Sequence, residues 1–171
     1  MDNPSRGKIF RLLSGGLIFA GVFLTLQYLY FSGEHSEWRR VFIEQITLGP
    51  VIELIRLISP GQAVTGMDGS IVAPGLRLSL RTGCDGADAM ILLVSAFAAA
   101  GLHWKRAVPG VMGGLALIFA FNQLRIAALY FAFASDRTWF DLLHGFVGPV
   151  LLIALSAAYF FFVLEHRPAA A

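Results

Sequence analysis

Apolar residues gather in four long runs along the chain, at about 12–31, 85–104, 107–134 and 146–164. A helix of roughly 20 mostly apolar residues crosses a hydrocarbon core about 30 Å thick. The run lengths therefore predict four transmembrane helices in a single membrane domain over 1–171. The composition agrees, because 57% of the residues are hydrophobic and only 14% are charged, which excludes an ordinary soluble domain of this length.

The segment between the first two runs, residues 32–83, mixes apolar and charged residues instead. Over 36–59 the apolar residues recur at helical spacing, and Arg39 falls outside the side on which they gather. That apolar side is formed by Trp38, Phe42, Ile46 and Leu48. Because its charged residues would be costly in lipid, this stretch is expected to lie in the outer interface as a helix that Pro50 breaks or kinks.

The second half of this loop carries turn signals rather than helical spacing. An Asp-Gly pair at 68–69 and a Pro-Gly pair at 74–75 mark turns. Leucines then alternate with polar residues over 76–80, and this period of two predicts a short β-hairpin-like loop that leads into Cys84. The expected fold is an all-α integral membrane protein with one outer interfacial helix and this loop.

Short basic flanks orient the spans, because Lys and Arg near span ends stay in the cytoplasm. Arg11 precedes the first span, Lys105 lies in the short turn between the second and third, and Arg167 follows the fourth. Both chain ends then face the cytoplasm and the loop 32–83 faces the outside. The arginines of the outer segments weigh less, since the rule weakens in long loops.

Four polar residues stand out at or inside the predicted membrane. On this topology Cys84 and His144 lie at the outer starts of the second and fourth spans. Asn122 and Arg125 lie in the outward half of the third span, three residues apart and so on one helix face. The four side chains are therefore expected to converge on the outer side of the bilayer.

These residues also have ordinary structural interpretations. A lone cysteine usually packs as a small residue, and Asn122 suits a helix–helix contact. Arg125 is harder to explain, because it lies roughly 13 Å below the outer end of its span. A guanidinium at that depth costs several kcal/mol unless it meets water or a carboxylate. Asp88 and Asp141 are the candidate partners in a purely structural role.

Taken together, the four residues suit attack on an acyl carbonyl. A thiolate at a helix N-terminus is a strong nucleophile, and a histidine beside it can take the proton of the thiol. Arg125 can hold the developing oxyanion, with Asn122 one turn away to orient it. The expected roles are nucleophile for Cys84, base for His144 and charge stabiliser for Arg125.

Two nearby acids work against this chemistry. Asp85 and Asp88 are interpreted as first-turn acids that complement the helix dipole. Their negative charge disfavours a second anion on Cys84. Arg81 and Arg125 are the cations expected to offset them.

Charge and cysteine content narrow the function classes further. The formal net charge of +2 argues against a nucleic-acid partner, which usually needs a concentrated basic patch. The single cysteine excludes an intrachain disulfide and a zinc site built from a cysteine cluster. No metal and no cofactor are expected, and the lipid bilayer is one expected partner.

At this point the motifs resemble those of a known family. "GCDG" before a span, "NQLRIAALY" within the next and "FDLLHGFV" opening the last are similar to the Cys, Asn-x-x-Arg-Ile and His motifs of the exosortase/archaeosortase family. The resemblance covers about 83–152, and the short chain resembles the small exosortase H-type subgroup. One departure is Asp85, where the family pattern has a small or neutral polar residue.

The resemblance implies an integral-membrane cysteine transpeptidase with Cys84, Arg125 and His144 as catalytic residues and Asn122 in support. It implies a bacterial inner-membrane location with the site facing the periplasm. Its substrates would be exported proteins whose C-terminal tails combine a short motif, a hydrophobic helix and a basic end. Two other classes stay open: a non-catalytic membrane assembly subunit, and a small transporter with Arg125 as its anion site.

Overall fold

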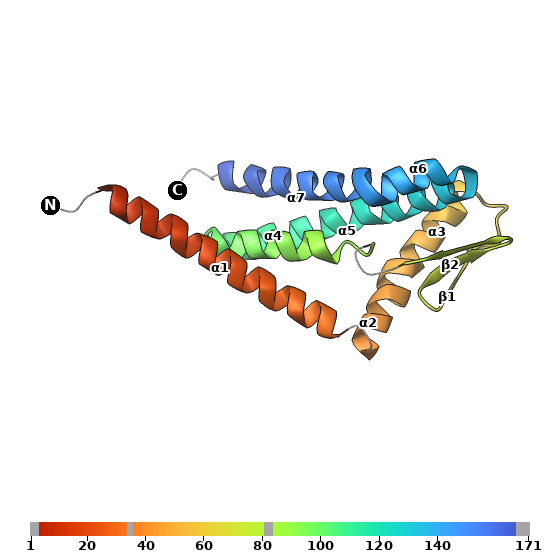
Figure 1. Cartoon of the computed structure of the whole chain (residues 1–171), viewed down its shortest axis with the longest axis horizontal. Coiled ribbons are helices and arrows are strands. Elements are labelled where there is room, and N and C mark those ends of the chain that lie inside the picture. The colour runs from red at the N-terminus through yellow and green to blue at the C-terminus, as the bar shows by residue number, and fades with distance from the viewer. Residues whose placement is uncertain (1–3, 34–35, 81–83, 167–171) are drawn as a thin grey trace.

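Long helices dominate the computed structural model, which describes residues 4–33, 36–80 and 84–166. Figure 1 shows four of them lying along the long axis of the molecule. They are α1 (Pro4–Ser32), α4 (Ala87–Ala99), α5 (Trp104–Ser135) and α7 (Gly148–Glu165). This arrangement is typical of a helical membrane protein.

Within the described residues, three helices are long and apolar enough to cross a membrane. They cover Gly7–Ser32, Trp104–Ser135 and Arg137–Glu165. The span predicted over 85–104 is shorter than expected, because α4 has only 13 residues, or roughly 20 Å of helix. Gly86 and Gly101 bound it with positive φ angles of 79° and 62°, a backbone that glycine adopts without strain.

A tightly packed core joins α4, α5 and α7. Leu93 and Phe97 of α4 are buried beside Ile118 of α5 and Leu152 of α7. Glycine lets the helices approach closely here, since a β-carbon at Gly110 would lie 2.7 Å from the Phe97 ring. This core fixes the start of α4 and the segment before α7 at the same end of the bundle.

A continuous helical run crosses that end of the bundle (Figure 1). It consists of α2 (Glu37–Val41), a seven-residue π-helix η1 (Phe42–Leu48) and α3 (Gly49–Ile58). The helical run passes through Pro50 without the predicted break, and its pattern changes from π-helical to α-helical at Gly49, one residue before the proline.

The apolar side predicted for this run is divided, because Leu48 does not lie on one side with Trp38 and Ile46. Leu48 is buried, but Trp38 is 51% exposed and Ile46 is exposed as well. Arg39, placed outside the apolar side, is buried. Side chains of a π-helix have a different angular spacing from those of an α-helix. The buried residues of the run from α2 to α3 therefore do not follow a single α-helical period.

The buried face of α3 packs against both α5 and a small sheet. Val51 and Ile55 of α3 lie in one cluster with Ile126 of α5 and with Ile71 and Leu78 of the sheet. The run 36–58 is therefore held against protein along its second half, and it rests on the helix that carries Asn122 and Arg125.

The sheet has three antiparallel strands in the order β1-β2-β3, where a strand pair was predicted. They are β1 (Thr65–Met67), β2 (Ser70–Ala73) and β3 (Leu76–Ser79). The two predicted turns are confirmed, with positive φ at Asp68, Gly69 and Gly75. The extra strand is β1, whose three residues are all exposed and so lack the alternation that reveals a strand.

Both described chain ends and the turn between α4 and α5 lie at one end of the molecule, and the sheet and α3 lie at the other. The predicted topology requires this grouping, because it puts Lys105 with the chain ends and Cys84 with the loop 32–83. The structure contains no membrane, so the side that each end faces stays a prediction.

Candidate active site

Cys84 lies in the short loop that enters α4. It is 6% exposed and precedes Gly86, whose left-handed backbone starts the helix at Ala87. The sequence placed Cys84 at the helix N-terminus, but the residue stands ahead of the first turn. The helix dipole, which acts mainly within the first turn, therefore contributes less to a thiolate than predicted.

His144 faces the thiol, as the sequence predicted. Its Nδ1 lies 3.5 Å from Sγ of Cys84, although 60 positions separate the two residues. The imidazole stacks on the ring of Phe140, with centroids 5.3 Å apart and planes 5° from parallel. This stacking fixes the ring plane, so the nitrogen stays directed at the sulfur.

The loop of Cys84 is also tied to α5. Asn122 is fully buried, and its Nδ2 donates to the carbonyl oxygen of Cys84 at 3.2 Å. Nη1 of Arg125 donates to Oδ1 of the same asparagine at 3.4 Å. A chain of contacts therefore joins His144, Cys84, Asn122 and Arg125, and all four predicted site residues lie together.

Arg125 has capacity for another partner. No described carboxylate lies within ion-pair distance of its guanidinium, and its buried Nε has no hydrogen-bond acceptor among the described residues. Asp88, a predicted structural partner, accepts a hydrogen bond from Nε2 of Gln27 at 3.1 Å instead. The guanidinium thus keeps a hydrogen-bond donor that no described residue satisfies.

A groove of about 240 Å³ runs beside this guanidinium. Apart from Arg125, its walls are formed by apolar side chains and Gly148, drawn from α5, α7 and the segment before α7. Gly148 leaves room for the arginine, since a β-carbon there would lie 3.0 Å from Cδ of Arg125 and closer still to Nε. It would also lie 2.8 Å from the carbonyl oxygen of Leu143.

The segment before α7 is helical, with α6 (Arg137–Leu142) followed by a second π-helix, η2 (Leu143–Val147). The N–H of Gly148 donates to the carbonyl of Leu143, five residues back. His144 lies inside this turn. Both π-helices are followed by the same three residues, Gly-Pro-Val, at 49–51 and 148–150.

Asp85, which follows the thiol, belongs to a buried polar network. Its Oδ1 accepts the backbone N–H of Ala87 at 3.2 Å, and its Oδ2 accepts the hydroxyl of Tyr30. Nη2 of Arg39 lies 3.9 Å from that Oδ2, and both charged side chains are 3% exposed. The prediction that Asp85 is a first-turn acid is therefore wrong; it is a buried carboxylate ahead of the helix.

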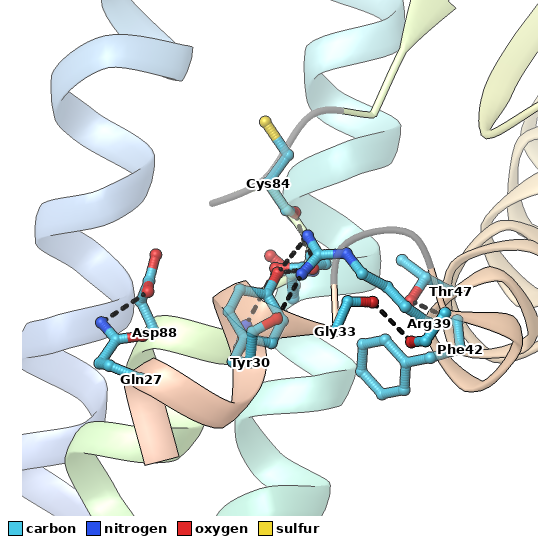
Figure 2. A network of polar contacts seen from close by, with 12 residues as sticks. Gln27, Tyr30, Gly33, Arg39, Phe42, Thr47, Cys84 and Asp88 are labelled. Carbon is cyan, nitrogen blue, oxygen red and sulfur yellow. Dashed lines mark hydrogen bonds and ion pairs between the residues drawn. The ribbon is translucent and has the colours of Figure 1, made fainter. Parts of the chain in front are cut away.

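Arg39 and Tyr30 hold this network together (Figure 2). Nη2 of Arg39 donates to the Tyr30 hydroxyl at 2.9 Å, and Nη1 donates to the Tyr30 carbonyl at 3.2 Å. The guanidinium carbon also lies 4.1 Å from the centroid of the Tyr30 ring. Figure 2 shows the sulfur of Cys84 turned away from these contacts.

The sequence prediction did not include Arg39 or Tyr30. The available signal was their position, because Tyr30 ends the first apolar run and Arg39 opens the segment that follows it. Arg81, which was expected to offset the acids, lies outside the described residues. Arg39 offsets Asp85 in the part of the chain that the structure describes.

The side chains at this site are of the chemical kinds that acyl transfer requires. A thiol beside an imidazole can act as a nucleophile with its base, and a guanidinium with an unused donor can stabilise an oxyanion. The amide of Asn122 contacts both the Cys84 loop and Arg125. Over the described ranges, no three His, Cys, Asp or Glu side chains gather closely enough to hold a metal ion. No protein-family model, no curated protein and no solved structure matches the chain.

Proposed function

We propose that this protein is a membrane-embedded cysteine peptidase and transpeptidase. It cleaves C-terminal sorting tails of exported proteins and transfers the shortened proteins to a surface acceptor. The observation that carries the proposal is the 3.5 Å contact between Sγ of Cys84 and Nδ1 of His144. The resemblance to exosortases supplies the substrate class, which is a tail with a short motif, a hydrophobic helix and a basic end.

In the first half-reaction, Sγ of Cys84 attacks the carbonyl carbon of the peptide bond before the tail, and its proton passes to Nδ1 of His144. The carbonyl oxygen becomes an oxyanion, which accepts hydrogen bonds from the guanidinium of Arg125. The carbon–nitrogen bond then breaks, and the departing amine takes the proton from His144. The exported protein is left as a thioester on Cys84.

In the second half-reaction, a nucleophile on the acceptor attacks the thioester carbon and gives its proton to His144. The carbon–sulfur bond breaks, and the thiolate of Cys84 recovers that proton. An amine nucleophile makes the step a transfer, and water makes it a hydrolysis. No cofactor enters either half-reaction.

The proposal includes a fourth membrane crossing at α4. The helix itself is too short for a full core, and the proposed span of about 85–104 adds the residues that flank it at 85–86 and 100–104. A short helix can be accommodated where the surrounding bilayer thins. In the proposed bacterial inner membrane, Cys84 and His144 then face the periplasm, and both chain ends face the cytoplasm.

The test is the turnover of two Arg125 variants on a co-expressed protein that carries such a tail, normalised to enzyme level. Arg125→Lys keeps a cation but loses the planar fork that binds an oxyanion through two donors. We expect it to insert and accumulate normally and to lose turnover about 10²–10³-fold, the usual cost of removing an oxyanion donor. Arg125→Leu should lose at least as much.

Near-normal processing by Arg125→Lys would contradict the proposal, because a structural cation or an anion-transport site needs charge more than fork geometry. A useful control is Arg137→Lys on α6. Arg137 contacts Phe133 through its guanidinium at 5.1 Å and lies outside the chain of contacts around Cys84, so this variant should process the tail at the wild-type rate.

A further inference from the structure

A carboxylate directly after a nucleophilic thiol presents an electrostatic problem. Loss of the thiol proton creates a second negative charge beside the first, and like charges disfavour this. Asp85 is 3% exposed, so water screens its charge poorly. A thiolate on Cys84 therefore requires a positive charge close enough to Asp85 to offset its negative charge.

Arg39 is placed to balance it. Its guanidinium is equally buried and lies 3.9 Å from Oδ2 of Asp85, and the hydroxyl of Tyr30 bonds to both side chains. The arginine comes from α2, the tyrosine from α1 and the carboxylate from the Cys84 loop. Two neighbouring helices and a loop distant from them in the sequence thus meet around a single negative charge.

We propose that Arg39 is a positioning residue that acts on Cys84 through Asp85. Its charge cancels that of the carboxylate and so allows the neighbouring thiol to ionise, and its bonds keep the carboxylate directed away from the sulfur. The inference rests on the proposed function in one respect, that Cys84 is the nucleophile. It also accounts for the acid at Asp85, where the family that the motifs resemble has a small or neutral polar residue.

Other charged or titratable groups among the described residues also face this region, and none of these replaces Arg39. His144 contacts the sulfur directly, and Arg125 is held through Asn122. Asp88 adds a further carboxylate in the first turn of α4 and is bonded to Gln27. Arg39 is the cation that lies against Asp85 among the described ion pairs.

The test measures the rate at which iodoacetamide alkylates Cys84 as a function of pH, in the full-length protein in detergent. The chain has one cysteine, so all labelling reports on this thiol. Arg39→Gln leaves the carboxylate unbalanced, and we expect the midpoint of the alkylation profile to rise by about one pH unit. Asp85→Asn leaves the guanidinium unbalanced, and the midpoint should fall by a similar amount.

The double variant Arg39→Gln/Asp85→Asn removes both charges, and its midpoint should return to the wild-type value. The control is Arg40→Gln, which removes a neighbouring cation from the same helix. Arg40 is 64% exposed and pairs with Glu37, so its loss should leave the profile unchanged.

Shifts of opposite sign identify an electrostatic role, because a merely structural network would slow alkylation in both single variants at every pH. Two shifts of the same sign, or none, would overturn the inference. If Arg39→Gln fails to accumulate, Asp85→Asn still decides, since a shift to higher pH or no shift would contradict the proposed balance. A wild-type thiol that reacts no faster than a free model thiol would refute the proposed function instead.

Discussion

At the scale of single residues, two glycines shape the site. Gly86 has a φ of +79°, and a β-carbon there would lie 3.0 Å from Cγ of Asn122. Gly148 leaves the space that the side chain of Arg125 fills. Both contacts involve a proposed site residue, so the geometry of the site requires glycine at these two positions, and the positive φ favours glycine at Gly86 as well.

Gly148→Ala is expected to displace the guanidinium of Arg125. The new methyl group would also meet the backbone oxygen of Leu143 at 2.8 Å, which cannot move without disturbing the helix. We expect turnover to fall about 100-fold, the usual effect of a misplacement near 1 Å, and stability to fall by about 1–3 kcal/mol. Tail cleavage and thermal unfolding are the measurements.

The control for that variant is Gly49→Ala, in the other Gly-Pro-Val segment. A β-carbon at Gly49 would meet nothing within 4 Å, so turnover and stability should stay close to the wild-type values. Equal losses in the two variants would show that glycine matters for the helical turn and not for Arg125.

The sequence predicted the four site residues but not the residues that support them. Asn122 and Arg125 are three positions apart on one helix, so their contact follows from helical geometry. The contact between Cys84 and His144 follows from the number of membrane crossings predicted between them. The pairing of Arg39 with Asp85 depends on how α2 packs across the bundle, and no local spacing in the sequence encodes that packing.

At the scale of elements, the π-helix η2 determines the direction of His144. A π-helical turn holds one residue more than an α-helical turn, and such turns are frequent at functional sites. Removing one residue from η2 would restore an α-helix and rotate everything before the deletion by about 100° relative to α7. His144 would then leave the thiol.

Deletion of Phe146 tests this role of η2. The Phe146 side chain is largely exposed, so its loss removes little packing, and we expect the variant to accumulate yet lose both tail cleavage and rapid alkylation of Cys84. The matched control is Phe146→Ala, which removes the same ring and keeps the residue count. Normal cleavage by the deletion variant would show that η2 does not direct His144.

Hydropathy and turn residues predicted most elements, and the miss at Pro50 has a physical cause. The long helices follow from long apolar runs, and the two turns follow from their Asp-Gly and Pro-Gly pairs. Pro50 was expected to break its helix because proline lacks an N–H. A π-helix before the proline removes that conflict, and its wider turn leaves no periodic signal in a sequence this short.

At the scale of the whole molecule, the fold separates two ends. The turn between α4 and α5 lies at the same end as both described chain ends, and the start of α4 lies at the end that carries α3 and the sheet. A tail that enters the membrane from the periplasm can reach Cys84 only if the second end faces that side. Orientation is therefore part of the proposed function.

Reporter fusions after Gly33, Lys105, Arg137 and Arg167 measure that orientation. The positive-inside rule predicts that the four positions alternate between outside, inside, outside and inside. A cytoplasmic signal at Arg137 would place His144 on the wrong side for an exported substrate. The predicted result is a cytoplasmic signal at Lys105 and Arg167 and an external signal at Arg137.

The most direct measurement is the mass of any adduct that forms on Cys84 during turnover of a tailed substrate. The reaction is quenched with acid, and the protein is then analysed by mass spectrometry. The account predicts an adduct on Cys84 equal to the substrate without its tail, which hydroxylamine releases as expected for a thioester. Cys84→Ala should insert normally, form no adduct and leave the tail intact. Full processing of the tail by Cys84→Ala would contradict covalent catalysis by the chain's single thiol.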